Sequence, residues 1–215
     1  MITFKTFLED IQVSDERYSR DESDVTVDRE NEHFDKSKFK KLNLSIPFPK
    51  KDFSVWANKK TFVLVKAEDD KSFEHVALSL EMDTFNLIVK SAKISETLPA
   101  IMTISAGKDY QGMGLAPMLY TYLIEGGLIL VSSRDQTPGG QSIWMRLLDK
   151  KIGVPFVIKH TWVSSVDKGK LSDTLVTGNV AKLKKLAYKS EDYRLMIVPK
   201  QHALLAKFEN VAEKI

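Results

Sequence analysis

The most regular feature of the chain is a series of short segments in which apolar residues cluster or alternate with polar ones. Residues 61–67 are mostly β-branched, aromatic or aliphatic, which favours a β-strand. Three further segments with a strand-like pattern follow, at 74–82, 85–94 and 99–105. Because consecutive strands joined by short turns usually pair antiparallel, these segments predict an antiparallel meander.

A helical pattern replaces the strand pattern after residue 113. Pro117 fits only the first turn of a helix, so we expect this helix to begin near Gly114. The pair Gly126-Gly127 is typical of a helix end. Apolar residues recur between these limits with the spacing of one helix face, at Leu115, Met118, Leu119, Tyr122 and Leu123.

The rest of the chain alternates between strand and helix patterns. The pattern predicts strands at 128–133, 155–163 and 193–198 and helices at 141–150 and 180–188, with polar loops at 134–140 and 164–178. Residues 201–215 carry apolar side chains at helical spacing, which fits either core packing or a partner-binding helix. A meander followed by alternating elements predicts an α/β (α+β) fold, with a central, mostly antiparallel sheet flanked by helices.

Charge is distributed unevenly over the first 60 residues. Residues 14–35 hold nine acids and three arginines and almost no apolar residue, so we expect a solvated or flexible stretch. Residues 36–60 hold eight lysines and one acid, Asp52. These lysines fit a solvated face or partners for the acidic stretch, and also a phosphate-binding patch. We therefore divide the chain into a charged, partly flexible N-terminal extension, 1–60, and a folded domain, 61–215.

Composition excludes several classes of protein. The chain has 215 residues, of which 43% are apolar, and a net charge of +3, so it can bury a core and is not strongly basic. It has no cysteine, which excludes disulfides, thiolate metal sites and a cysteine nucleophile. Its four histidines lack metal-ligand spacing, so no metal site is predicted. No apolar run approaches the roughly 20 residues of a membrane span, and no secretory signal is visible, so we expect no membrane partner and a cytoplasmic location.

Small residues alternate at the start of the first predicted helix, at Gly112, Gly114 and Ala116. The backbone N–H groups of a helix start, together with the helix dipole, attract a pyrophosphate. Small residues let the backbone approach such a ligand closely. A sharp strand-to-helix turn would explain the same glycines without a ligand. The spacing of a dinucleotide-binding glycine loop is absent.

The segment Gln111-Gly112-Met113-Gly114-Leu115-Ala116 resembles the acyl-CoA motif Gln/Arg-x-x-Gly-x-Gly/Ala of the GNAT superfamily of N-acetyltransferases, and Asp109-Tyr110 resembles its acidic-aromatic lead-in. The order strand, loop, motif, helix, strand, loop, helix is also similar to the core of that family. The resemblance covers about residues 61–160.

The resemblance implies an acetyl-CoA-dependent N-acetyltransferase with an amine acceptor that the sequence does not identify. The loop amides would hold the CoA pyrophosphate, and the end of the preceding strand would pair with the pantetheine arm. The implied cofactor-binding residues are Ile104, Ser105, Ala106, Gln111, Gly112, Met113, Gly114, Leu115 and Ala116.

Two other segments resemble proteins of tailed phages. Residues 136–141, followed by Trp144, are similar to a stretch of phage-encoded GNAT-like proteins. Residues 1–11 form a short amphipathic piece that fits a docking helix and also resembles capsid-targeting peptides of phage internal proteins. A phage origin would place the protein in the host cytoplasm or in the virion. It also allows a second function, a catalytically inactive GNAT-like module bound to a virion component or to nucleic acid.

Four residues are considered for the chemistry itself. Many GNAT enzymes use a tyrosine in the second helix as a general acid, and Trp144 occupies that segment here; its indole N–H cannot protonate a thiolate usefully. Glu96 and Glu81 are candidate bases, and both also fit exposed surface carboxylates. Ser132, at the end of a strand, fits either a substrate contact or a satisfied turn. His160 lies in an apolar segment and fits a satisfied core histidine.

Overall fold

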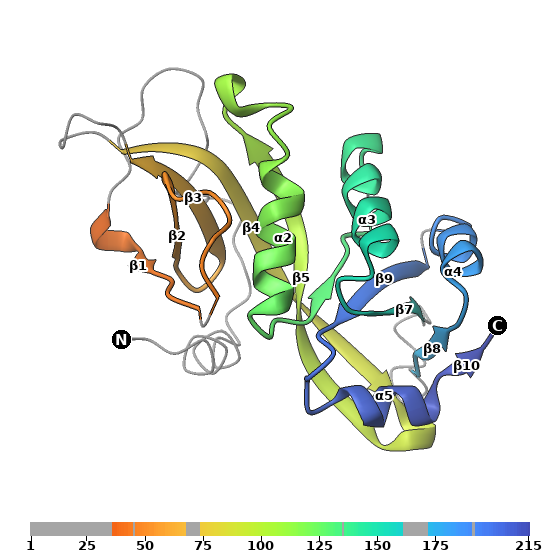
Figure 1. Ribbon diagram of the computed structural model, residues 1–215. Helices are drawn as coiled ribbons and strands as arrows, with labels where there is room; N and C mark the ends of the chain where they lie inside the picture. Colours follow the sequence, from red (N-terminus) through yellow and green to blue (C-terminus); the bar gives the residue numbers. More distant parts are fainter. Residues whose placement is uncertain (1–35, 45, 68–73, 135, 161–171, 191) are drawn as a thin grey trace, which may run out of the picture. The chain divides into compact units, whose positions relative to one another are not determined.

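The computed structural model describes residues 36–44, 46–67, 74–134, 136–160, 172–190 and 192–215 (Figure 1). The acidic stretch 14–35 and the N-terminal piece 1–11 therefore lie outside the described residues. The chain forms two compact units. The N-terminal unit comprises residues 1–82 and 103–122, and the C-terminal unit comprises residues 83–102 and 123–215.

The N-terminal unit is built around antiparallel strands. It holds a 3-10 turn, η1 (Lys36–Lys38), the strands β1 (Lys40–Lys41), β2 (Phe53–Ala57) and β3 (Thr61–Ala67), and the first part of β4 (Glu74–Val89). Val55 of β2 faces Leu64 of β3, and Leu64 faces Leu78 of β4. The predicted strand at 61–67 is confirmed. Strand β2 was not predicted, because lysines surround a short segment whose alternate residues are buried.

Strand β4 corrects the predicted meander. The two strands predicted at 74–82 and 85–94 are one continuous strand of 16 residues. The residues at the predicted break, Asp83 and Thr84, are exposed and include no glycine or proline to end a strand. The chain turns later, at the 3-10 turn η2 (Lys90–Ala92), where Lys93 adopts a left-handed φ of 52°. Strand β5 (Ile94–Ala106) therefore begins earlier than the predicted residue 99.

The C-terminal unit contains the second part of β4, the first part of β5, and five further strands: β6 (Leu130–Val131), β7 (Val154–Lys159), β8 (Thr174–Thr177), β9 (Tyr193–Val198) and β10 (Glu213–Lys214). The described strands are hydrogen-bonded in the order β1-β2-β3-β4-β5-β6-β9-β7-β8-β10. Two of the pairs, β5 with β6 and β8 with β10, are parallel. A mixed α/β protein with a mostly antiparallel sheet is thus confirmed.

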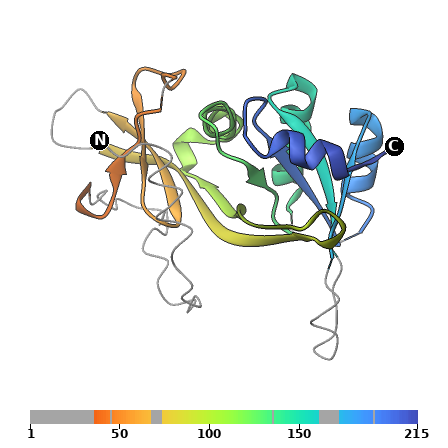
Figure 2. The ribbon, with the colours of Figure 1, turned by 90° about the horizontal axis from the view of Figure 1, so that it is seen from below.

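Four α-helices accompany the described strands: α2 (Leu115–Glu125), α3 (Pro138–Lys150), α4 (Val180–Ala187) and α5 (Leu205–Val211). Helices α3 and α4 lie beside one another, and α4 packs on β7 and β9 (Figures 1 and 2). Helix α3 begins before the predicted residue 141, because the Thr137 side chain accepts a hydrogen bond from the Gly140 N–H and caps it. No helix in the described ranges is long and apolar enough to cross a membrane.

Three of the predicted C-terminal elements are shorter than expected. The buried strand predicted at 128–133 is reduced to the two residues of β6. The strand predicted at 155–163 corresponds to β7, and its last three residues lie outside the described ranges. The apolar stripe at 201–215 forms the short helix α5, followed by β10. Its role is core packing, since Phe208 of α5 is fully buried.

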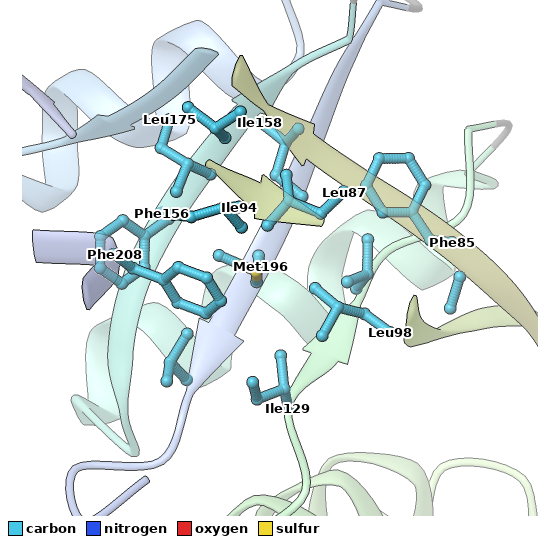
Figure 3. Close-up of a cluster of buried hydrophobic side chains, with 14 residues drawn as sticks. Phe85, Leu87, Ile94, Leu98, Ile129, Phe156, Ile158, Leu175, Met196 and Phe208 are labelled. Atoms are coloured by element: carbon cyan, nitrogen blue, oxygen red, sulfur yellow. The ribbon is translucent and has the colours of Figure 1, made fainter. Parts of the chain in front are cut away.

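The core of the C-terminal unit is a cluster of apolar side chains from strands β4 to β9 and helix α5 (Figure 3). The rings of Phe156 and Phe208 meet edge to face, with centroids 6.1 Å apart. Met196 lies in the same cluster, between residues of different strands. Burial of these large side chains is the main stabilising contribution to this unit.

Candidate cofactor site

The loop that leads from β5 into α2 belongs to the N-terminal unit. A 3-10 turn, η3 (Lys108–Tyr110), follows the strand. The Gly107 N–H donates to the Ala77 carbonyl over 3.1 Å, which ties the loop to β4. The Tyr110 ring meets the Phe53 ring edge to face at 6.2 Å. These contacts fix the base of the loop on strands β2 and β4.

Gly112 and Gly114 both adopt left-handed backbone angles, with φ of 77° and 71°. Apart from the adjoining residues, no heavy atom lies within 4 Å of the position that a Cβ would take at either glycine. The glycines are therefore needed for their backbone conformation, which other residues adopt only with strain. The space in front of them is open to a ligand.

The backbone N–H groups around these glycines are largely unused. The N–H of Met113 donates to Tyr110, and the Gly114 carbonyl accepts from Met118. Among the described residues, the N–H groups of Gly112, Gly114, Leu115 and Ala116 find no protein acceptor. The Gln111 side chain lies over the strand end, with its Nε2 3.5 Å from the Ala106 carbonyl oxygen. A row of unpaired donors at the start of an 11-residue helix is suited to bind an anion.

The resemblance assigns the end of β5 to the second part of the implied cofactor site. Ile104 and Ala106 are half-buried, and Ser105 is exposed. In the described part of the sheet, β5 pairs with β6 through a single pair of residues, Ala100 and Val131. Residues 104–106 lie beyond this pair and are not paired with β6.

Glu96, the first candidate base, belongs to the C-terminal unit. Its carboxylate accepts a hydrogen bond from the Lys207 ammonium over 3.4 Å, and 29% of its side chain is exposed. The second candidate, Glu81, lies on β4 in the N-terminal unit, opposite Thr61. The structure does not place either carboxylate in a described cavity.

Ser132 is fully buried in the C-terminal unit. Its Oγ accepts a hydrogen bond from the Leu195 N–H over 3.0 Å, and its own N–H donates to the Leu195 carbonyl over 2.8 Å. Its carbonyl oxygen lies 3.4 Å from Nη1 of Arg194. Ser132 thus extends the pairing of β6 with β9. Its hydroxyl satisfies the backbone, so the structure favours a structural role over a contact with substrate.

Trp144 is 2% exposed on the inner face of α3. Leu147 and Leu148 of the same helix are also buried. The structure therefore gives Trp144 a core position. Its indole ring does not substitute for a solvent-accessible acid.

Two features of the C-terminal unit were not predicted from the sequence. The first is the contact between His160 and Asp173, whose Nδ1 and Oδ1 atoms are 2.7 Å apart. The prediction that the histidine is satisfied is confirmed. Its partner was not predicted, because Asp173 lies in a stretch expected to be loop. The second is a polar cavity at the start of α3, lined in part by Arg134 and Tyr188. Nothing in the sequence pattern had indicated this cavity.

Comparisons with protein-family models, with curated proteins and with solved structures each found no match for this chain. The assignment of a function therefore depends on the geometry above.

Proposed function

We propose that the chain is an acyl-CoA-dependent N-acetyltransferase of the GNAT kind, acting on an amine acceptor. The observation that carries this proposal is the pair of left-handed glycines, Gly112 and Gly114, at the start of α2. They present unpaired N–H groups to open space, and the segment resembles the acyl-CoA motif. A simple strand-to-helix turn would show the same bend and the same unused N–H groups, because the first N–H groups of any helix lack an intrahelical acceptor; the resemblance to the acyl-CoA motif is what favours a ligand here.

Each part of the loop has a role in this proposal. The N–H groups of Gly112, Gly114, Leu115 and Ala116 bind the CoA pyrophosphate, and the α2 dipole adds to the attraction. The backbone of Ile104, Ser105 and Ala106 pairs with the pantetheine arm and holds the thioester in position. Met113, which is 43% exposed, covers apolar parts of the cofactor.

Bound acetyl-CoA supplies a thioester, an acyl group that an amine attacks directly. A backbone N–H at the end of β5 polarises the thioester carbonyl as charge develops on its oxygen. The amine nitrogen forms the new C–N bond, the C–S bond breaks, CoA leaves as a thiolate, and the proton lost by the nitrogen passes to water or to that thiolate. A thiolate is stable enough to leave without an acid, so the absence of a tyrosine at Trp144 is compatible with turnover. Positioning the amine beside the thioester supplies most of the acceleration.

A second function is favoured because both candidate catalytic residues already have partners within the protein. Ser132 is buried and hydrogen-bonded to β9, and Glu96 is paired with Lys207. These observations support a GNAT-like module that binds an acyl-CoA without transferring the acyl group. The resemblance to phage-encoded proteins implies that such a module would be associated with the virion or with nucleic acid. The exposed lysines of the N-terminal unit, such as Lys40 and Lys41, suit an anionic partner.

Calorimetric titration with acetyl-CoA tests the proposal. The test variant is Gly114→Glu, which places bulk and a negative charge beside the pyrophosphate. The matched control is Gly127→Glu, because Gly127 also has a left-handed φ, 105°, and open space around it, but lies after the other end of α2. We expect the wild-type chain and the control to bind and Gly114→Glu not to bind. If none of the three chains binds acetyl-CoA, the cofactor site is refuted.

Turnover separates the two functions once binding is established. Release of free CoA thiol is measured with amines, polyamines, nucleosides and lysine peptides as acceptors. Turnover that Gly114→Glu abolishes and Gly127→Glu preserves supports the transferase. Binding of acetyl-CoA without turnover above the hydrolytic background favours the inactive module.

A further inference from the structure

Five exposed cations lie on or beside helices α3 and α4 of the C-terminal unit, which are neighbours in Figure 1. Arg146 and Lys150 are four residues apart on α3, and Lys151 follows this helix. Lys182 and Lys185 are three residues apart on α4. Because residues three or four apart share a face of a helix, each helix presents its cations together. We call these five residues the basic face.

The end of α3 lies beside the start of α4. Lys151 lines the same small cavity as Val180, the first residue of α4. The Lys184 Nζ lies 2.5 Å from Oδ1 of Asp149, and this ion pair joins the two helices. The cations of the basic face are therefore near this ion pair and not at opposite ends of the two helices.

Acids do not neutralise the basic face in the described stretches that carry it. Between residues 136 and 160 and between residues 172 and 190, the acids are Asp149 and Asp173. Asp149 is paired with Lys184, and Asp173 is buried beside His160. None of the five cations forms an ion pair within the part of the chain that the structure describes. Their positive charge is left for a partner outside the chain.

Helix stability does not account for all of these cations. Lys150 and Lys185 lie in the last turns of their helices, where the helix dipole favours a positive charge. Lys182 lies in the first turn of α4, where the dipole disfavours one. Arg146 and Lys150 carry like charges four residues apart, which repel each other. An anionic partner would relieve both costs.

The basic face has no apolar side chain suited to enter a membrane. Leu183 and Ala187, on the inner side of α4, are buried. The large apolar residues that are exposed in the described ranges are Met102, Met113 and Ile215, and none of these belongs to α3 or α4. Because a helix that binds a lipid surface inserts apolar side chains into it, the basic face is better suited to a polyanion in solution.

The aromatic residues of the two helices are not exposed for stacking. Trp144 of α3 is 2% exposed, and the half-buried Tyr188 at the end of α4 donates its hydroxyl to Gln136. Proteins that bind single-stranded nucleic acid stack its bases on aromatic side chains. A duplex keeps its bases stacked and presents one phosphate charge for about every 1.7 Å of its axis. The basic face therefore matches a duplex better than a single strand.

We propose that the basic face binds the phosphate backbone of a nucleic-acid duplex, independently of base sequence. Lysine ammonium groups act on phosphates as point charges, and such contacts carry no sequence information. All five cations belong to the C-terminal unit, whereas the acyl-CoA loop belongs to the N-terminal unit. The proposal therefore rests on neither acyl-CoA binding nor acyl transfer. It also goes beyond the anionic partner considered above, which was connected with lysines of the N-terminal unit.

Fluorescence anisotropy of a labelled DNA duplex, titrated with the full chain at several salt concentrations, tests the proposal. We expect saturable binding whose log K falls with log[salt] at a slope of about −4 to −5, because each of five neutralised phosphates contributes about −0.9. Lys182→Gln combined with Lys185→Gln should weaken binding about tenfold and reduce the slope by about 2. Lys150→Gln combined with Lys151→Gln provides a second pair of exposed changes, with the same expected effect.

The matched control is Lys93→Gln combined with Lys159→Gln, which removes the same charge from the same unit. Both lysines are exposed and lie outside α3 and α4, one at the turn after η2 and the other at the end of β7. The affinity and the salt slope of this control should equal those of the wild type. Gly114→Ala, in the acyl-CoA loop, should also bind the duplex as the wild type does, so failure of that loop and failure of the basic face are distinguished.

Four outcomes would overturn the proposal. The first is the absence of saturable duplex binding at low salt. The second is an equal loss in the control and in the test pairs, which indicates attraction to net charge alone. The third is binding that neither test pair changes, and each pair decides alone if the other does not fold. The fourth is tighter binding to a single strand of the same length or to vesicles of anionic lipid, because the basic face would then have a different partner.

Discussion

The Nδ1 atom of His160 lies 2.7 Å from Oδ1 of Asp173, a carboxylate whose side chain is only 4% exposed. The other carboxylate oxygen accepts a hydrogen bond from the Ile88 N–H over 2.8 Å. The Asp173 N–H donates to the Ile88 carbonyl in return. One buried aspartate thus joins strand β4 to the ends of β7 and β8 within the C-terminal unit.

Removal of this carboxylate should destabilise the C-terminal unit. Asp173→Ala leaves the Ile88 N–H and the His160 ring without their acceptor, so we expect a loss of about 2–3 kcal/mol in the free energy of unfolding. Asp149→Ala is the control, because Asp149 is 65% exposed and pairs with Lys184 at the surface. Its loss should be under about 1 kcal/mol. Urea unfolding measures both, and equal losses would contradict a special role for Asp173.

His202 should make stability depend on pH. Burial lowers its pKa below the usual 6.5, and the negative charge of Glu96 opposes this shift without cancelling it. The Nδ1 of His202 accepts a hydrogen bond from the Leu204 N–H over 3.1 Å, which requires an unprotonated nitrogen. Because the folded state binds the proton more weakly than the unfolded state, the contribution is present above pH 6.5 and is lost as pH falls below it.

The pH effect of His202 is measured by urea unfolding of the wild type and of His202→Gln at several pH values between about 5 and 8. The stability difference between the two chains should shrink as pH falls below the usual histidine pKa. A difference that grows towards low pH would mean that the pKa is raised instead.

Replacement of Ser79 by alanine should not destabilise the protein, unlike replacement of most buried polar residues. Its hydroxyl is buried on β4 and finds no hydrogen-bond partner among the residues that the structure describes. Ser79→Ala should therefore leave stability unchanged or raise it by up to about 1 kcal/mol. In Ser54→Ala, by contrast, the Trp56 Nε1–H loses the acceptor that now lies 2.8 Å away, and stability should fall. Urea unfolding that ranks Ser79→Ala below Ser54→Ala would contradict this assignment.

The elements that the sequence predicted well are those whose pattern reflects local burial. Strand β9 (Tyr193–Val198) coincides with its prediction because its apolar residues are contiguous and buried. Helix α2 begins where Pro117 and Gly114 indicated. Strand β8 (Thr174–Thr177) was expected to be loop, because its short polar-apolar stretch becomes a strand only through pairing with β7. Tertiary pairing also explains the continuity of β4.

In the candidate site, too, local features could be predicted from the sequence, and contacts between distant residues could not. A glycine loop at a helix start is a local feature, and residues 111–116 predicted it from their own composition. The bond between Ser132 and Leu195 joins residues 63 positions apart, and the Lys207–Glu96 bond joins residues 111 apart. No spacing in the sequence reports such contacts, so the availability of Ser132 and Glu96 for catalysis could not be judged without the structure.

Trp144 should matter for stability rather than as an acid. Trp144→Ala removes a large buried ring from α3 and should cost about 3–5 kcal/mol in the free energy of unfolding. Trp144→Tyr keeps an aromatic ring and should be tolerated better. Arg146→Ala, an exposed change on the same helix, is the control and should have little effect. Thermal or urea unfolding measures the series, and a mild effect of Trp144→Ala would show that the ring is not part of the core.

The left-handed glycines allow backbone strain to be separated from cofactor binding. Gly114→Ala and Gly127→Ala each force an L-residue into a positive φ, of 71° and 105°, with open space around the new methyl group. Each should therefore lose roughly 1–2 kcal/mol of stability through strain alone. Only Gly114 lies beside the unpaired N–H groups at the start of α2. If these groups bind the CoA pyrophosphate, Gly114→Ala should weaken acetyl-CoA about tenfold by disturbing their alignment.

Urea unfolding and calorimetric titration with acetyl-CoA, on the same two alanine variants, provide the comparison. Similar losses of stability with a loss of affinity confined to Gly114→Ala would tie binding to the loop rather than to the general stability of α2. Gly112→Ala, at a φ of 77°, should behave as Gly114→Ala does, because its N–H belongs to the same row of donors. Equal affinities in Gly114→Ala and Gly127→Ala would indicate that the glycines serve only the turn from β5 into α2, and the loop would then have a structural role without a ligand.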